Sequence, residues 1–164
     1  TYINGEGATI NGLEATAKTA FSFLPGWLSG FGIDANYTHQ IASHVGLYSA
    51  LDGSPLPFPG LYSDSYNLTL WYQKYGISTR LAYNYRSRYL SVANDSYGEP
   101  IYHDPTGYLD GRLAYTSPSL KNVTYFVEGK NLTKQAERYT AGGVRLTETG
   151  YFGRRFFVGV TYKY

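Results

Sequence analysis

The chain has 164 residues, enough for one domain, and its net charge of +2 is too small to indicate nucleic-acid binding. It contains no Cys, which excludes disulfide frameworks, thiol catalysis and cysteine-based zinc sites. Aromatic residues (18%) outnumber charged ones (16%), and no apolar run approaches the ~18 residues of a transmembrane helix, so a helical membrane protein is excluded and a membrane β-barrel is not.

Strict alternation of apolar and polar residues predicts strands with two different faces. The alternation occurs in seven segments, which in chain order are residues 10–23, 31–42, 61–73, 77–90, 107–116, 123–131 and 151–164. The fourth segment shows it most clearly, with one face made of Ile77, Leu81, Tyr83, Tyr85 and Tyr89 and the other of Ser78, Arg80, Asn84, Arg86 and Arg88. The sequence therefore predicts an all-β fold of antiparallel strands.

The charged residues indicate which face of each strand is exposed to water and which is covered by apolar surroundings. In the central part of every predicted strand they fall on the face opposite the aromatic residues. A Lys or Arg facing lipid at the bilayer midplane costs ~2–4 kcal/mol, so a transmembrane β-barrel requires this segregation. The alternative is a soluble antiparallel sheet with one buried face, but such a sheet would bury Val, Ile and Leu more than Tyr.

Aromatic residues also gather at one set of turns, which is typical of an interfacial girdle. They are Phe21, Phe23, Phe31, Tyr72, Tyr115, Tyr125, Tyr162 and Tyr164. The connections alternate in length: 24–30, 74–76 and 117–122 are short, and 43–60, 91–106 and 132–150 are long. Because outer-membrane barrels have short periplasmic turns and long extracellular loops, we expect the three long segments to lie outside the cell.

The last eight residues, 157–164, resemble the C-terminal assembly signal of bacterial outer-membrane proteins. In that signal a glycine is followed by two residues, an aromatic, one residue and a terminal aromatic. Gly159, Tyr162 and Tyr164 occupy these places, whereas Phe157 stands where the signal usually has a polar residue. The resemblance implies recognition of this strand by the barrel-assembly machinery.

The predicted number of strands is odd, whereas bacterial single-chain barrels have even numbers. An open sheet would also leave two unpaired edges in lipid. We therefore expect the chain to be the C-terminal part of a larger barrel, or to borrow strands from another copy. The alternative is a small self-contained eight-stranded barrel in which residues 1–9 supply the eighth strand, although the segment from Asn4 to Gly7 is typical of a loop.

Five stretches, in order along nearly the whole chain, add a family resemblance. They begin at Leu24 (LPGWLSGFG, then ANYT), Pro57 (PFPGL, then SYNL), Arg80 (RLAYNYRS), Glu128 (EGKNLT) and Gly153 (GRRFFVGV). Together they resemble the barrel of TonB-dependent outer-membrane receptors of Gram-negative bacteria. The resemblance implies that residues 1–164 form the final seven strands of a barrel of roughly 22, with the plug domain and the TonB box absent from this sequence.

The same resemblance implies energy-coupled uptake of a scarce solute, such as a siderophore, another metal chelate, a vitamin or an oligosaccharide. The implied partners are outer-membrane lipid, the remainder of the barrel and the plug, the TonB complex acting through the plug, and the extracellular solute. The chain itself is expected to supply barrel wall and surface loops. An outer-membrane anchor or adhesin is the alternative function, and an outer-membrane enzyme is a third.

Two groups of residues are candidates for the functional site. A polar track is predicted to face the lumen, either as a wet wall or as a path for an anionic or hydroxyl-rich solute; it comprises Arg80, Asn84, Arg86, Arg88, Asp110 and Arg112. Residues of the long segments are candidates for ligand contact, because loop aromatics stack on sugars and planar chelates; they are Tyr48, Phe58, Tyr97, Tyr102, His103 and Tyr139.

Catalysis has little support in the sequence. His39, His44 and His103 are far apart, and no second metal ligand stands at a suitable spacing from any of them. No Ser/His/Asp arrangement can be assigned from the predicted strands. We therefore expect neither a cofactor nor a metal, and no enzymatic activity.

Overall fold

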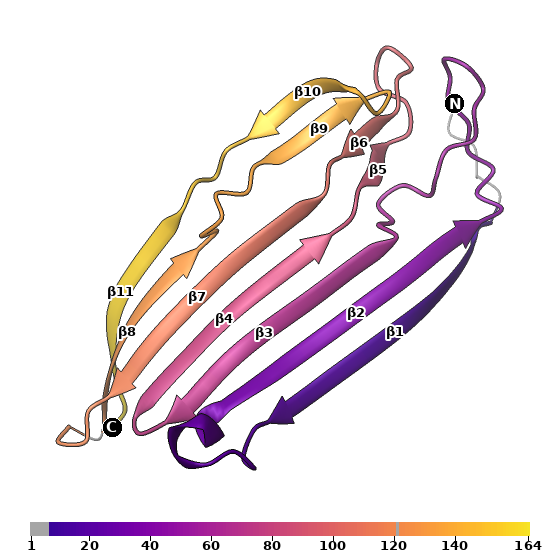
Figure 1. Ribbon diagram of the computed structural model, residues 1–164. Coiled ribbons are helices and arrows are strands. Elements are labelled where there is room, and N and C mark those ends of the chain that lie inside the picture. Colours follow the sequence, from indigo (N-terminus) through magenta and orange to yellow (C-terminus); the bar gives the residue numbers. More distant parts are fainter. Residues whose placement is uncertain (1–6, 121) are drawn as a thin grey trace.

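The computed structural model describes residues 7–120 and 122–164, which form eleven β-strands and one short 3₁₀ helix, η1 (Gly26–Gly30) (Figure 1). The larger of two antiparallel sheets has the strand order β1 (Thr9–Ala20), β2 (Phe31–Ser43), β3 (Asp64–Lys74), β4 (Ile77–Arg86), β7 (Thr106–Thr116), β8 (Val123–Lys130) and β11 (Arg155–Tyr162). The smaller sheet has the order β10 (Arg145–Gly150), β9 (Glu137–Ala141), β6 (Ile101–His103) and β5 (Tyr89–Val92). The antiparallel all-β fold expected from alternation is confirmed.

The seven predicted strands correspond to the seven strands of the larger sheet, with ends that differ by up to four residues and two larger differences. The predicted strand 77–90 is wrong at its end, because β4 stops at Arg86 and β5 begins a separate strand at Tyr89. The predicted long loops 91–106 and 132–150 also contain three strands of the smaller sheet, β6, β9 and β10, and the end of the fourth, β5. These strands have three to six residues, too few for an alternating pattern to stand out from chance.

Successive strands of the larger sheet run in opposite directions, so the connections fall at two ends. The short connections lie at the lower end of Figure 1, where the C-terminus is also found. One of them is the hairpin Tyr75-Gly76, in which both residues have positive φ (56° and 77°), as a two-residue type I′ turn requires. The smaller sheet lies at the opposite end and continues the larger one above β4, β7, β8 and β11 (Figure 1). We call these the short-connection end and the long-connection end.

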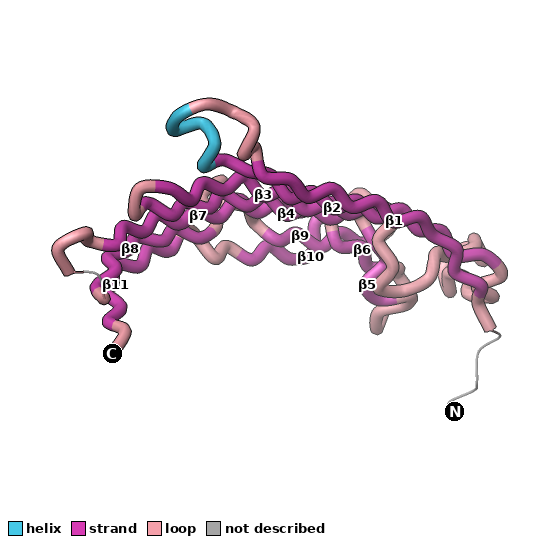
Figure 2. Tube along the Cα trace, turned by 90° about the horizontal axis from the view of Figure 1, so that it is seen from below, coloured by secondary structure: helices cyan, strands magenta, loops and turns pink. Residues whose placement is uncertain are grey.

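The larger sheet is a single curved layer, and none of the residues that the structure describes forms a second layer over its apolar face (Figure 2). Among the described residues the buried apolar side chains are only Leu56, Leu90, Pro100, Ala114 and Ala141. The chain exposes 11161 Å², whereas a compact monomer of its mass exposes roughly 8,100 Å². Large apolar side chains in mid-sheet stay open, with Leu81 41% exposed and Leu68 43% exposed. The fold therefore has no core of its own, and its apolar face needs an external cover.

Both edges of the larger sheet are open in the part of the chain that the structure describes. β1 pairs only with β2, and β11 pairs only with β8. Both edge strands run toward the short-connection end, so a direct pairing between them would be parallel (Figure 1). Most of the segment 1–9, considered above as an eighth strand, lies outside the described residues. The structure is thus an open sheet and not a closed cylinder.

Aromatic rings lie over several glycines of neighbouring strands, and two cases illustrate the contact. A Cβ atom added to Gly32 would collide with the ring of Trp71, whose Nε1 donates a hydrogen bond to Asp34 (3.2 Å). A Cβ atom added to Gly159 would come within 2.5 Å of the ring of Phe126. Both positions therefore need glycine because an aromatic ring occupies the space of a Cβ atom, and not because of an unusual backbone angle.

Asn131 fixes the bend where the chain leaves β8. Its side chain bonds both backbone groups of Gln135, and its own N–H donates to the Asp110 carboxylate (2.9 Å). It is only 4% exposed and has φ = 54°, a left-handed value that asparagine tolerates better than most residues. Leu132 follows and packs over Gly111 and Gly129, which lie opposite each other in the register. The bend connects the two sheets.

We expect Asn131→Ala to loosen this bend, because it removes the side-chain hydrogen bonds and places alanine at positive φ. Unsatisfied buried partners cost ~1–3 kcal/mol, so trypsin cleavage after the neighbouring Lys134 should accelerate about tenfold or more, as measured by mass spectrometry. Asn131→Gly, which suits the backbone angle, should show a smaller effect. Asn11→Ala, at an exposed position of β1, is the control. Equal cleavage rates in all four proteins would contradict the assigned role.

Candidate functional site

One face of the larger sheet collects the polar residues predicted to line a lumen. The register places Arg80 directly opposite Arg112, and Asn84 between Asn67 on β3 and Tyr108 on β7. The other predicted members on these strands follow the same pattern, with Arg86 opposite Ser65 and Thr106, and Asp110 opposite Ala82. Five of the six track residues therefore lie together on one face of β4 and β7.

The sixth residue, Arg88, does not belong to this track. It lies beyond the end of β4, where its guanidinium group stacks on the ring of Tyr102 (4.4 Å) and donates to the Thr140 hydroxyl (3.1 Å). The sequence pattern placed it on the face of Arg86 because the alternation continues through residues 87 and 88, although the strand does not. Arg88 instead holds β6 and β9 of the smaller sheet.

Charges on the polar face are only partly balanced. Arg112 pairs with Glu128 (3.3 Å) and covers the ring of Phe126 (4.2 Å). Glu128 also contacts Lys130 (3.4 Å), while Arg80 has no ion pair among the described residues. Arg80 and Arg112 lie directly opposite each other, and like charges in this arrangement destabilise a sheet. These side chains line a cavity of about 310 Å³ whose charged members carry a net positive charge.

A second cavity, of about 370 Å³, lies where the polar face meets the smaller sheet. We call it the rim pocket. Strands β3, β4 and β7 contribute Asn67, Asn84, Arg86 and Tyr108, and the smaller sheet contributes His103, Glu137 and Tyr139. It is the place where residues from several predicted groups converge.

His103 forms the back wall of the rim pocket and is 5% exposed. Its ring stacks on Tyr89 (5.0 Å, 14°) and meets Tyr139 edge to face (4.7 Å, 90°). Its Nδ1 lies 2.8 Å from the Asp104 carbonyl oxygen, which can only accept, so Nδ1 carries a proton. Burial raises the pKa of the Tyr139 hydroxyl above its ordinary value. The wall is therefore aromatic and tightly held.

Glu137 is the carboxylate of the rim pocket. It accepts a hydrogen bond from the Tyr108 hydroxyl (2.8 Å) and lies 3.9 Å from Nε2 of His103. Within residues 7–120 and 122–164, no group of three or more His, Asp and Glu side chains is placed to hold a metal ion. The pocket offers hydrogen bonds and aromatic surface for binding.

Of the six predicted ligand-contact residues, only His103 and Tyr139 line the rim pocket. Tyr102 is next to His103 in β6, so its side chain points to the other side of that strand, under Arg88. The remaining three lie elsewhere in the long segments: Tyr48, Phe58 and Tyr97, of which Tyr97 is 80% exposed. Sequence reasoning placed Tyr89 on the apolar face of one continuous strand, whereas the break after Arg86 brings it to the rim pocket. It missed Glu137, because β9 is too short to be recognised.

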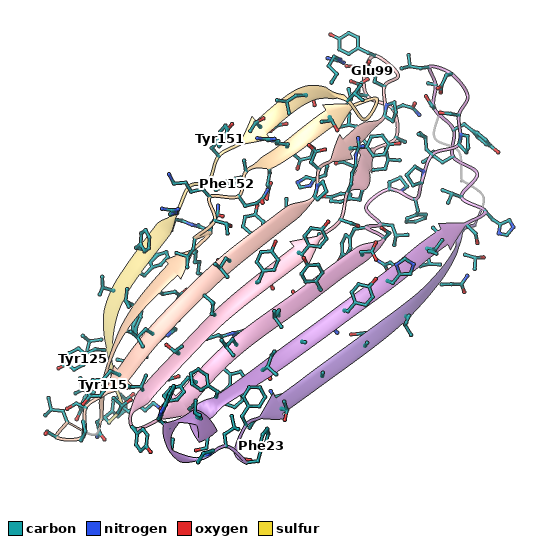
Figure 3. The ribbon with its side chains drawn as sticks, in the orientation of Figure 1. Phe23, Glu99, Tyr115, Tyr125, Tyr151 and Phe152 are labelled. Carbon is teal, nitrogen blue, oxygen red and sulfur yellow. The ribbon has the colours of Figure 1, made fainter. Side chains whose placement is uncertain are left out.

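The three residues of the expected assembly signal are divided between the faces of β11. Tyr162 is the last residue of the strand, and Tyr164 follows it with its side chain fully exposed. Gly159 is on the opposite face, under Phe126. At the short-connection end, Phe21 and Phe23 contact each other, as do Phe31 and Tyr72. Figure 3 shows Phe23, Tyr115 and Tyr125 along this same end, away from Tyr151 and Phe152.

Comparisons of the chain with models of protein families, with curated proteins and with solved structures found no match. In the part of the chain that the structure describes, no helix has the length and apolar character needed to cross a membrane.

Proposed function

We propose that the chain forms part of the wall of an outer-membrane β-barrel in a receptor of the TonB-dependent type. The observation that carries this proposal is the single-layer sheet, whose apolar face is uncovered while the charged side chains in the middle of its strands share the other face. A lipid bilayer is a cover that suits such a face. The polar face would then line the lumen.

The dimensions of β3 support lipid as the cover. On its apolar face, residues charged at neutral pH occur only at the ends, Asp64 and Lys74, with Leu68 and Leu70 between them. The ten residue steps between the ends correspond to ~34 Å along the strand and, at a tilt of ~40°, to ~26 Å of height. The apolar band of an outer-membrane barrel is ~25 Å tall.

Aromatic rings flank this aliphatic band at both ends. Toward the short-connection end, Phe31 packs on Tyr72 (4.8 Å), and toward the long-connection end Tyr66 stacks on Tyr85 (4.7 Å). Next to the aromatic rings at the long-connection end, Asp64 accepts hydrogen bonds from Tyr37 and His39. Aromatic girdles followed by polar groups are typical of membrane interfaces.

The directions of the edge strands support a larger barrel. Because β1 and β11 run the same way, a ring of identical copies would need a parallel seam between each pair. Outer-membrane barrels are antiparallel throughout. Antiparallel closure requires an odd number of further strands between β11 and β1, which a barrel of roughly 22 strands supplies.

A receptor for energy-coupled uptake combines these features with the family resemblance described above. The polar face and the rim pocket would contact a solute arriving from outside the cell, and the TonB complex would act through a plug domain. The three long segments would lie outside, and the short connections in the periplasm.

Site-directed labelling tests this topology, because residues 1–164 contain no Cys and each introduced cysteine is therefore unique within them. Any cysteine elsewhere in the full-length protein is first replaced by serine. In the full-length protein expressed in Gram-negative cells, the cysteine introduced by Tyr97→Cys should react with a membrane-impermeant maleimide on intact cells. The cysteine introduced by Ser119→Cys, in a short connection, should react only after the outer membrane is permeabilised. Labelling of Ser119→Cys on intact cells, or recovery of the protein outside the outer-membrane fraction, would contradict the proposal.

A further inference from the structure

We infer that the rim pocket binds a neutral, hydroxyl-rich solute of the saccharide type. This inference rests on the proposed receptor function and specifies its substrate class. It depends on the charge, the free hydrogen-bonding groups and the aromatic walls of the pocket.

The charge of the rim pocket favours a neutral ligand over an anionic chelate. Its charged residues are one guanidinium, Arg86, and one carboxylate, Glu137. Neither stands isolated, because Arg86 lies over the ring of Tyr62 (5.4 Å) and Glu137 accepts from Tyr108. The neighbouring cavity around Arg80 and Arg112 has excess positive charge and fits an anion better. The two cavities therefore differ in the ligand that they suit.

The floor of the rim pocket carries two free amides. Asn67 and Asn84 lie directly opposite each other on β3 and β4, and their side chains make no hydrogen bond to the described residues. Each amide offers two donors and one carbonyl acceptor. Adjacent sugar hydroxyls both donate and accept, so they match a pair of amides, whereas a carboxylate or catecholate ligand can only accept.

The aromatic wall supplies a surface for the apolar face of a sugar ring. Tyr89, His103 and Tyr139 pack against one another, so little side-chain freedom remains to be lost on binding. The cavity of about 370 Å³ falls at the small end of the ~300–1,000 Å³ range of ligand pockets. This size suits a short saccharide unit and not a large macrocycle.

The experiment measures binding to the full-length protein purified in detergent, by isothermal titration calorimetry. The probes are neutral mono- to tetrasaccharides of glucose, galactose, mannose and N-acetylglucosamine, with iron(III) citrate as the anionic probe. We expect saturable binding of at least one neutral saccharide and a weaker response to iron(III) citrate.

Two variants locate the binding site. The double variant Asn67→Leu/Asn84→Leu, which keeps side-chain size and removes the amides, should weaken saccharide binding at least about tenfold. Gln73→Leu is the matched control, because Gln73 lies on the same face of β3, ~20 Å from Asn67 along the strand, outside the pocket. It should bind as the unaltered protein does. Each variant is first shown to reach the outer membrane with the labelling pattern of the parent.

Three outcomes would overturn the inference: no saturable binding of any neutral saccharide, tighter binding of iron(III) citrate, or equal weakening by Gln73→Leu and the double variant. These outcomes leave the proposed barrel function intact if the labelling topology is as expected. Conversely, saccharide binding by a protein that is not inserted in the outer membrane would support the pocket and contradict the receptor.

Discussion

Leu81→Arg is expected to reduce the amount of full-length protein in the outer membrane several-fold. Leu81 lies in the middle of β4, 41% exposed, opposite Leu70 and Gly111 in the register. If this face meets lipid, an arginine near the midplane costs ~2–4 kcal/mol. The measurement is quantitative immunoblotting of outer-membrane fractions, together with the heat-induced shift in electrophoretic mobility that reports a folded barrel.

Two control variants bracket Leu81 in depth on the other face. Ser78→Arg and Asn84→Arg lie three residues before and after it, on the face that already carries Arg80. Both should insert nearly as well as the parent, because their side chains would reach water in the lumen. Equal losses in all three variants would refute the assignment of the faces.

Gly32→Ala is expected to destabilise the sheet by displacing Trp71. The added methyl group would occupy the space of the indole ring, and moving that ring would break its hydrogen bond to Asp34. Forcing extra volume into a packed contact typically costs ~1–3 kcal/mol. Urea titration of the folded protein in detergent, followed by tryptophan fluorescence, should show a lower midpoint of unfolding and an altered emission spectrum before unfolding.

Gly111→Ala is the matched control for this effect. Gly111 is also a mid-sheet glycine, but its added Cβ atom would lie 3.4 Å from Leu132 and 3.5 Å from Leu81, which are ordinary contacts. The variant should therefore unfold at or slightly above the urea midpoint of the parent, since alanine restricts the unfolded chain more than glycine does. A midpoint lowered as much as in Gly32→Ala would show that the ring contact is not the cause.

The larger sheet could be predicted because its strands are long and carry a local pattern. In β4 every second residue from Ile77 to Tyr85 faces one side, and this alternation is readable without knowing any partner strand. The hairpin Tyr75-Gly76 is equally local, since a glycine between two alternating runs favours a tight turn. Register then follows from the short connections, which leave neighbouring strands little freedom to slip.

The candidate site could be predicted only in part. The alternation placed Arg80, Asn84 and Arg86 on one face, and His103 was noticed as a loop residue. The contact of His103 with Tyr139 joins residues 36 positions apart, through two strands that no pattern revealed. Asp110, expected in a solute track, also accepts a hydrogen bond from the backbone N–H of Asn131. This contact depends on where the neighbouring strand β8 ends.

The sequence by itself determined the strand class, the separation of apolar and polar faces, and the alternation of short and long connections. These features depend on residues that are close together in the chain, and an alternation with a period of two residues is enough to reveal them. Only the tertiary structure decided that the segments 91–106 and 132–150 contribute to a second sheet and that Arg88 stabilises it. It also decided that Tyr89, His103, Glu137 and Tyr139 meet at the rim of the polar face. These contacts join short strands distant in sequence, so their positions follow from the register of the whole sheet.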